Sequence, residues 1–295
     1  AHGSDSALWL APDANTAGAF RQRATRELAG LYDPRILTFP ALAHSLLNAN
    51  HAAVRELEPA QRELIIRELA AAPEVGLPPR LVASPGFIRA LSQFLDELKR
   101  AAIRHGDFQR ALQRHFPGDD RTQSLGRFYS AYQEYVERRN LFDEPGLFWW
   151  ARDLLADGKR APFEDVTLVL VDGFTDFTTT QLQVLRHLAQ FADETIVTLP
   201  LAEASEREQL FAAPRRLLSR LQAAVGEGQV EWLSECEGRP APLQHLLHNL
   251  FLLKPEQTDP ADNLQLLAAP GVLAEVREIM REVKSLLLDG VRPGD

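Results

Sequence analysis

Short apolar runs alternate with amphipathic helical patterns along most of the chain. A helical pattern follows each run, as residues 20–28 follow the first and residues 179–191 follow the third. Such alternation predicts a parallel α/β sheet. The expected strands are bounded by Pro, Gly, Asp or Asn and are Leu8–Ala11, Ile36–Phe39, Val166–Val171, Thr195–Leu199, Val230–Leu233 and Leu264–Ala268.

The long segment between the second and third expected strands has a different pattern. Residues 87–102 and 128–136 place apolar side chains at helical spacing, and Pro and Gly residues mark turns between such stretches. No strand pattern occurs there. The sequence therefore predicts an all-helical insertion that interrupts an α/β domain.

The last part of the chain changes character again. A polar stretch, Lys254–Asn263, precedes the sixth expected strand, and an amphipathic helix with Val276, Ile279 and Val283 on one face follows it. This strand and helix are expected to begin a second domain.

Composition and charge narrow the class of protein. The 295 residues are 45% hydrophobic and 25% charged, which is typical of a folded globular protein, and the net charge of −9 gives the whole molecule no attraction for nucleic acid. Residues 80–140, however, carry 11 basic and 7 acidic residues. Lys99, Arg100, Arg104 and Arg114 of this segment could contact phosphates, with nearby aromatic rings as stacking faces. The alternative is an ordinary charged helix surface over an aromatic core.

The compartment follows from cysteine usage and hydropathy. One cysteine, Cys236, cannot form an internal disulfide and predicts a reducing compartment, the cytoplasm. The longest apolar runs are far shorter than the ~20 residues that a membrane span needs, so no membrane partner is expected.

The most informative local pattern is an apolar strand that ends in an acid. Residues 166–171 lead directly into Asp172, and Asp176 follows. In nucleoside-triphosphatases a carboxylate at this sheet edge holds Mg²⁺ near the phosphates, and a second acid beside it orients water. Here the neighbour of Asp172 is Gly173, which has no side chain for that task. The plainer alternative is that Asp172 and Asp176 cap a turn and the next helix.

Other catalytic patterns are missing from the sequence. No Gly-x-x-x-x-Gly-Lys-Ser/Thr loop occurs, so the chain lacks a phosphate cradle and is not expected to hydrolyse ATP by itself. The eight histidines are dispersed, and only His245 and His248 share a helical face. We therefore expect no metal site and no catalytic residues in this chain.

Taken in order, these pieces resemble the first motor domain of superfamily I (UvrD/Rep-like) helicases. Leu8–Pro12 resembles the strand after the phosphate loop, and Ile36–His44 resembles the motif that contacts single-stranded DNA. Asn140–Leu147 falls where these proteins carry an acidic and hydrophobic stretch. Asp172–Asp176 stands where active helicases have Asp-Glu-x-x-Asp. This Asp-Gly-Phe variant is similar to the B subunit of bacterial ATP-dependent helicase–nucleases, the AddB/RexB type.

The resemblance implies a P-loop NTPase-like (RecA-like) parallel sheet with helices on both faces and an all-helical insertion. Residues 1–50 would be the first part of the α/β domain, and residues 51–160 the insertion. Residues 161–256 would return to the α/β domain, and residues 257–295 would begin a second, truncated motor-like domain. The family's phosphate loop and C-terminal nuclease are expected outside this chain.

By resemblance, the parent complex unwinds and resects broken DNA ends for recombinational repair with a partner subunit's motor. This piece would be a degenerate, non-hydrolysing domain that handles single-stranded or forked DNA and docks the partner subunit. Motif position selects Thr38, Phe39 and His44 as DNA contacts, and Asp172 and Asp176 as vestigial metal-side positions. No cofactor is expected in this piece. ATP, Mg²⁺ and an iron–sulfur cluster are implied only for the parent complex.

Three alternatives stay open at this point. The chain could be an active ATPase domain whose phosphate loop lies upstream. It could be a Mg²⁺-dependent phosphohydrolase that uses Asp172 and Asp176. It could also be a purely structural interaction module, which predicts no DNA affinity at moderate salt.

Overall fold

A computed structural model describes residues 6–27, 34–201, 207–226, 228–233, 241–258 and 266–292. Contacts group the chain into two units. The first comprises residues 1–203 and 208–230, and the second comprises residues 204–207 and 231–295. No helix in the described ranges is both long and apolar enough to cross a membrane.

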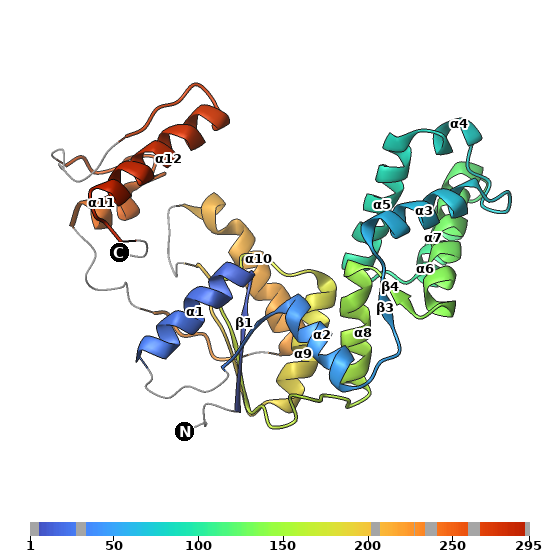
Figure 1. Ribbon diagram of the computed structural model, residues 1–295, viewed down its shortest axis with the longest axis horizontal. Coiled ribbons are helices and arrows are strands. Elements are labelled where there is room, and N and C mark those ends of the chain that lie inside the picture. The colour runs from blue at the N-terminus through green and yellow to red at the C-terminus, as the bar shows by residue number, and fades with distance from the viewer. Residues whose placement is uncertain are drawn as a thin grey trace. The chain divides into compact units, whose positions relative to one another are not determined.

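The first unit is built on a four-stranded parallel sheet (Figure 1). Its strands are β1 (Ala7–Ala11), β2 (Arg35–Thr38), β5 (Leu168–Val171) and β6 (Glu194–Val197), in the spatial order β2-β1-β5-β6. The first four expected strands are therefore confirmed, with ends shifted by one or two residues.

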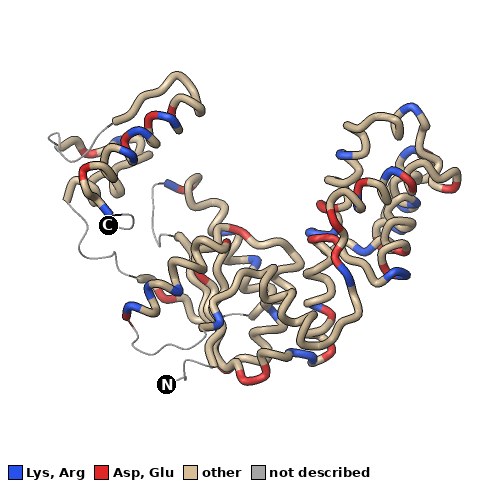
Figure 2. The backbone as a smooth tube through the Cα atoms, viewed as in Figure 1, with Lys and Arg blue, Asp and Glu red and all other residues tan. Residues whose placement is uncertain are grey.

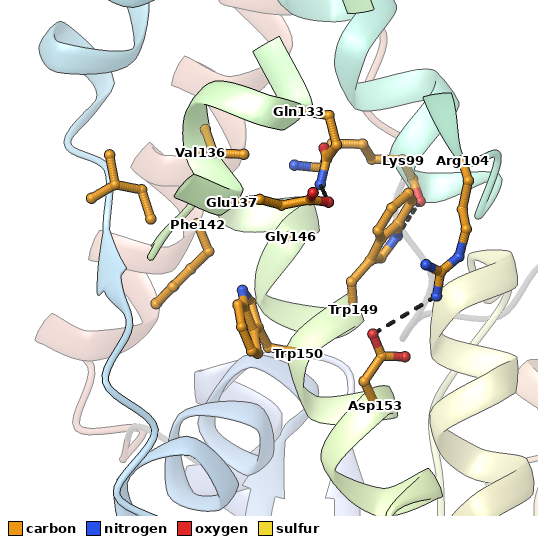
Figure 3. A pocket seen from close by; sticks show the side chains of 11 residues that line it. Lys99, Arg104, Gln133, Val136, Glu137, Phe142, Gly146, Trp149, Trp150 and Asp153 are labelled. Atoms are coloured by element: carbon orange, nitrogen blue, oxygen red, sulfur yellow. Dashed lines mark hydrogen bonds and ion pairs between the residues drawn. The ribbon is translucent and has the colours of Figure 1, made fainter. Parts of the chain in front are cut away.

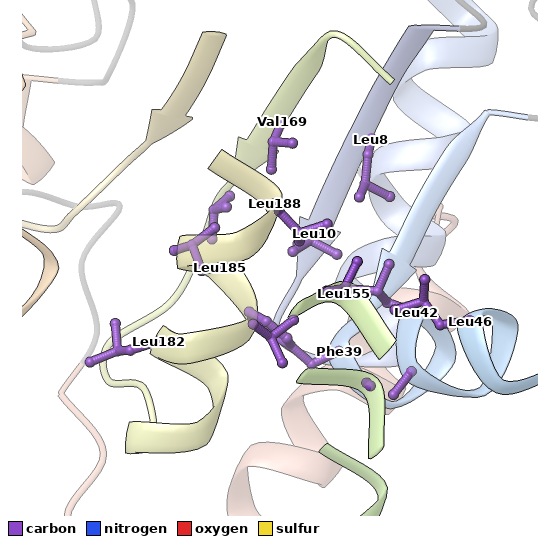
Figure 4. Close-up of a cluster of buried hydrophobic side chains, with 14 of the residues drawn as sticks. Leu8, Leu10, Phe39, Leu42, Leu46, Leu155, Val169, Leu182, Leu185 and Leu188 are labelled. Carbon is purple, nitrogen blue, oxygen red and sulfur yellow. The ribbon is translucent and has the colours of Figure 1, made fainter. Parts of the chain in front are cut away.

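Side chains of β1 alternate between the two faces of the sheet. Leu8 and Leu10 are fully buried in a large core under four helices, α2 (Phe39–Ala49), α8 (Glu144–Ala156), α9 (Thr179–Phe191) and α10 (Glu208–Val225) (Figure 4). Trp9 and Ala11 face the opposite side, where Trp9 stacks on Phe20 of α1 (Ala14–Glu27). Helices therefore cover both faces, as expected, and the α/β class is confirmed. The assignment to P-loop NTPases stays a prediction.

Residues 55–142 form a helical lobe with a core of its own. In the sequence, this lobe is inserted between β2 and β5. The largest side chains of this core, Phe128, Tyr129 and Tyr132, are fully buried. A parallel ribbon of two strands, β3 (Arg55–Glu56) and β4 (Leu141–Phe142), lies where the chain enters and leaves the lobe. The helices of the lobe are α3 (Pro59–Ala71), α4 (Pro79–Val82), α5 (Pro85–Arg100), α6 (His105–His115) and α7 (Asp120–Arg138).

The prediction of a fifth strand at Val230–Leu233 was wrong. These residues have no regular structure, and Leu233 is 79% exposed. A short run such as this, with three apolar residues around Glu231, forms a strand only where a sheet edge accepts its backbone hydrogen bonds. The sixth expected strand, Leu264–Ala268, lies partly outside the described residues, and Leu266–Ala268 are not a strand.

The second unit contains two helices in its described part, α11 (Ala241–Asn249) and α12 (Val272–Leu288). The amphipathic helix expected around Val276–Val283 is confirmed as α12. None of the described residues of α11 and α12 is buried. The role of this unit as the start of a second motor-like domain stays a prediction.

Candidate functional site

The carboxyl edge of the sheet contains a switch in strand order. The chain runs from β1 to β2 on one side and later places β5 on the other side of β1. Open α/β sheets bind ligands in the crevice at such a point. The residues that follow β1 and β5 therefore define the first candidate site: Pro12, Asp13, Asp172 and Gly173.

Asp13 occupies the start of the helix at this edge. Its carboxylate accepts hydrogen bonds from the backbone N–H of Thr16, at 2.9 Å, and from the Thr16 hydroxyl, at 3.0 Å. These hydrogen bonds lower the pKa of Asp13. The helix N-terminus after β1 thus carries its own negative cap, so it is poorly suited to hold a phosphate.

Asp172 and Asp176 are engaged by different elements. The hydroxyl of Thr198, just after β6, donates a hydrogen bond to the Asp172 carboxylate. The Asp176 side chain is 74% exposed and pairs with Arg220 of α10 at 2.8 Å. Arg220 also donates to the Phe177 carbonyl at 2.7 Å. Arg220 therefore ties the loop after β5 to α10.

Gly173 fits its place because of its backbone conformation. Its φ is +80°, in the left-handed region that other residues adopt at a cost of roughly 1–2 kcal/mol. A Cβ atom there would also lie 3.4 Å from Pro12 Cδ. That distance is an ordinary contact, so a glutamate in this position would meet backbone strain rather than a clash.

This edge shows no assembled cluster of metal ligands in the part of the chain that the structure describes. Within the described ranges, no three His, Cys, Asp or Glu side chains gather to hold a metal ion. Asp172 accepts a hydrogen bond from Thr198, and Gly173 contributes no oxygen from a side chain. Mg²⁺ needs near-octahedral oxygen coordination beside phosphates that the protein cradles.

The three residues selected by motif position have different surroundings. Thr38 caps α2, with its hydroxyl accepting from Ala41 N at 3.3 Å. Phe39 is 2% exposed and packs edge-on against Phe174 and Phe177. Phe39 thus offers no surface to DNA in this arrangement, because its ring belongs to the core. His44 is partly exposed on α2, 3.8 Å from Glu56.

The basic residues of the helical lobe divide into buried and exposed groups. Arg100, Arg104 and Arg114 are exposed, as phosphate contacts would have to be. Lys99 is only 1% exposed, so the prediction that it could contact a phosphate was wrong. Figure 2 shows acidic and basic residues interspersed along the backbone of this lobe.

Lys99 instead belongs to a buried ion network that the sequence analysis missed. Its ammonium donates to Asp143 Oδ1 at 2.5 Å. Tyr132 donates to Asp143 Oδ2 at 2.9 Å, and Arg62 lies 3.5 Å from the same oxygen. Arg62 also pairs with Asp96 at 2.6 Å. Both oxygens of the buried carboxylate are therefore satisfied, as burial requires.

The same network connects the lobe to the helices over the sheet. Asp143 is the N-cap of α8, accepting from Gly146 N at 2.9 Å. The carbonyl oxygen of Lys99 accepts from Trp149 Nε1 of α8, at 2.9 Å, and from the Thr180 hydroxyl of α9, at 3.1 Å. The end of α5 is thus fixed to two helices of the α/β layer.

A cleft of about 180 Å³ lies beside this network, between α5, α7 and α8 (Figure 3). Its lining includes the apolar side chains of Phe142, Trp149 and Trp150. Polar groups come from Lys99 of α5, from Gln133 and Glu137 of α7, and from Arg104, which lies 3.9 Å from Asp153. An aromatic wall with a few polar groups is typical of a binding site for a flat ligand.

The fold is a parallel α/β domain that a helical insertion interrupts between β2 and β5. Residues 3–250 match the family model described as "ADDB, N-terminal". The chain therefore belongs to the AddB N-terminal family.

Curated proteins agree with this assignment. The chain is 24% identical over 99% of its length to the B subunit of an ATP-dependent helicase/deoxyribonuclease from Listeria monocytogenes, covering 26% of that protein. It is 28% identical over 89% of its length to the protein of the same name from Desulforudis audaxviator, covering 24% of it. The chain thus spans about a quarter of these relatives.

Proposed function

We propose that this chain is the DNA-handling and subunit-docking part of a B subunit in an ATP-dependent helicase–exonuclease for double-strand break repair. The observation that carries this proposal is the match of residues 3–250 to the AddB N-terminal family. The names of the relatives, which describe a helicase/deoxyribonuclease subunit, supply the kind of complex and imply a partner subunit. The cytoplasmic location stays a prediction from the sequence.

We further propose that this part does not hydrolyse ATP. The conformation of Gly173, the hydrogen bond between Thr198 and Asp172, and the capped start of α1 support this role. Any ATP, Mg²⁺ or iron–sulfur cluster of the whole complex would then be bound by other regions or by the partner subunit. The motor activity would likewise come from outside this chain.

Asp172→Asn tests the non-hydrolysing role in the full-length subunit assembled with its partner. Asparagine keeps an oxygen for the Thr198 hydroxyl but removes the charge that a metal ion would need. DNA-stimulated ATP turnover is expected to stay within about twofold of the wild type, measured by phosphate release. A tenfold loss, which corresponds to ~1.4 kcal/mol in the barrier, would show that Asp172 serves an active site.

DNA handling predicts a salt-dependent affinity that involves the exposed arginines. In the same complex, we expect a variant with Arg100, Arg104 and Arg114 all changed to alanine to bind single-stranded and forked DNA more weakly. Each lost phosphate contact should reduce the slope of log K against log salt by about 0.7 on single strands. Fluorescence anisotropy across a salt series measures both the affinity and the slope.

A matched control changes arginines that pair with a glutamate on their own helix. Arg67 pairs with Glu63 and Arg138 with Glu134, each at 2.9 Å. The Arg67→Ala/Arg138→Ala variant should change the affinity and the slope less than the triple variant does. Equal losses per arginine removed in the two variants would indicate a general charge effect, and an unchanged slope in the triple variant would contradict the predicted contacts.

A further inference from the structure

The cleft beside Trp150 has walls suited to a flat ring. Figure 3 shows the side chains of Trp149 and Trp150 extending from α8 in different directions, with Glu137 above Trp150. Gly146 has no side chain, and a Cβ atom there would lie 2.7 Å from Asp143 Oδ1. Trp149 is held by its hydrogen bond to the Lys99 carbonyl, whereas Trp150 remains partly exposed. Trp150 is therefore the ring on which a ligand could stack.

The polar groups of the cleft call for a ligand that donates hydrogen bonds. Gln133 is 5% exposed, and its Nε2 donates to Glu137 at 2.9 Å. Its Oε1 atom is buried and has no hydrogen-bond partner in the described part of the protein. A buried acceptor without a partner is unfavourable, so a donor that reached it would be favoured. The soft terminal torsion of the glutamine allows its amide to turn toward such a donor.

The charges of the cleft disfavour an anion inside it. Glu137 and Asp153 line the cleft, and carboxylates repel phosphate groups. Lys99 also lines the cleft, but its ammonium is paired with Asp143. Arg104 lies over the Trp149 ring at 5.9 Å and is 61% exposed. A phosphate is therefore expected outside the cleft beside Arg104, while the interior takes a neutral group that carries donors.

We propose that this cleft binds one unpaired nucleobase with an exocyclic amino group. The base stacks on Trp150, and its amino group donates to Gln133 Oε1 or to the Glu137 carboxylate. Adenine, cytosine and guanine carry such a group and thymine does not, so the cleft favours the first three. Proteins that read extruded bases combine stacking with hydrogen bonds in this way. This inference rests on the proposed DNA-handling function and gives it a site.

The test uses the full-length subunit assembled with its partner and single strands that carry 2-aminopurine at successive positions. This fluorescent base has an exocyclic amino group, and stacking on an indole quenches its emission. One position is expected to be quenched more than its neighbours. Trp150→Leu should remove this extra quenching and weaken the overall affinity about tenfold, in the range of a lost base–aromatic stack. Trp150→Phe, which keeps a ring, should retain most of both.

Two further variants separate the cleft from general effects. Gln133→Leu should reduce the preference for an adenine over a thymine at the quenched position, measured by competition. Trp232→Leu changes a tryptophan that is 41% exposed in the second unit and should leave the quenching unchanged. A thermal melt of each variant reports whether the fold has been kept, and the lost base preference of Gln133→Leu carries the test if Trp150→Leu unfolds.

The outcomes distinguish this inference from the function on which it rests. If the complex binds DNA while all positions are quenched alike, or if Trp150→Phe and Trp150→Leu both leave the pattern intact, the cleft does not hold a base. The proposed function would survive that result. If the complex binds no DNA even at low salt, both the function and the cleft inference are overturned.

Discussion

Replacing Asp143 by alanine is expected to lower the free energy of unfolding by about 3–5 kcal/mol, because it leaves buried Lys99 without its counter-ion. The variant also loses the cap of α8 and the acceptor for the Tyr132 hydroxyl. Urea denaturation followed by circular dichroism measures the change. The loss should extend beyond α8, since the network joins helices α3, α5, α7 and α8.

A control and a double variant sharpen this prediction. Asp153→Ala removes a carboxylate whose side chain is 53% exposed, and should cost no more than about 1 kcal/mol. The double variant Lys99→Met/Asp143→Asn should be more stable than Asp143→Ala, because it removes the unpaired ammonium and keeps the cap. If Asp143→Ala lowered the free energy of unfolding as little as Asp153→Ala does, the network would not hold the lobe in place.

The same carboxylate makes stability depend on pH in the acid range. Burial raises the pKa of Asp143, but the charges of Lys99 and Arg62, with the hydrogen bonds from Lys99 and Tyr132, hold it below its usual value. A group with a lowered folded pKa stabilises the protein above its unfolded pKa, which is about 3.9 for Asp. This contribution is therefore lost as the pH falls below about 4, through the folded pKa. The free energy of unfolding should therefore decrease less steeply below about pH 4 in the Asp143→Asn variant than in the wild type.

The sheet was predictable because its strands are local features. An apolar run between turn residues shows where β1 or β5 begins and ends without reference to distant residues. Val230–Leu233 has the same local pattern but no strand partner. Whether a run pairs depends on a free sheet edge, and that is a property of the folded chain. The loop of Asp172 and Gly173 could be placed at the sheet edge for the same local reason.

The buried network was harder to predict because its members are far apart in the sequence. Lys99 lies four residues after Leu95, on the apolar stripe of α5, and this spacing was the available signal that it points inward. Its partner Asp143 is 44 residues away. Periodicity shows which face of a helix is buried, but it does not identify the acid that neutralises a buried lysine. The cleft was missed for the same reason, since α5, α7 and α8 all contribute to its wall.

Phe39 separates a packing role from a role in DNA contact. Motif position predicted a DNA contact, whereas the ring is 2% exposed and lies 5.5 Å from the ring centre of Phe174. Phe39→Ala is expected to lower the free energy of unfolding by about 3–5 kcal/mol, through lost burial and a cavity beneath the sheet edge. Phe39→Leu, which fills most of the space, should cost less. Denaturant unfolding of both variants measures the difference.

The control for this prediction is Phe116→Ala, because Phe116 is 53% exposed and its loss should change stability by no more than ~0.5 kcal/mol. DNA affinity of the same variants, measured well below their unfolding midpoints, completes the comparison. A packing role predicts that folded Phe39→Leu binds DNA like the wild type. If Phe39→Leu weakened DNA binding without changing stability, the ring of Phe39 would instead have to move out of the core and contact DNA. In that case Thr38 and His44 would again be expected to contact DNA together with Phe39, since both lie on or next to α2.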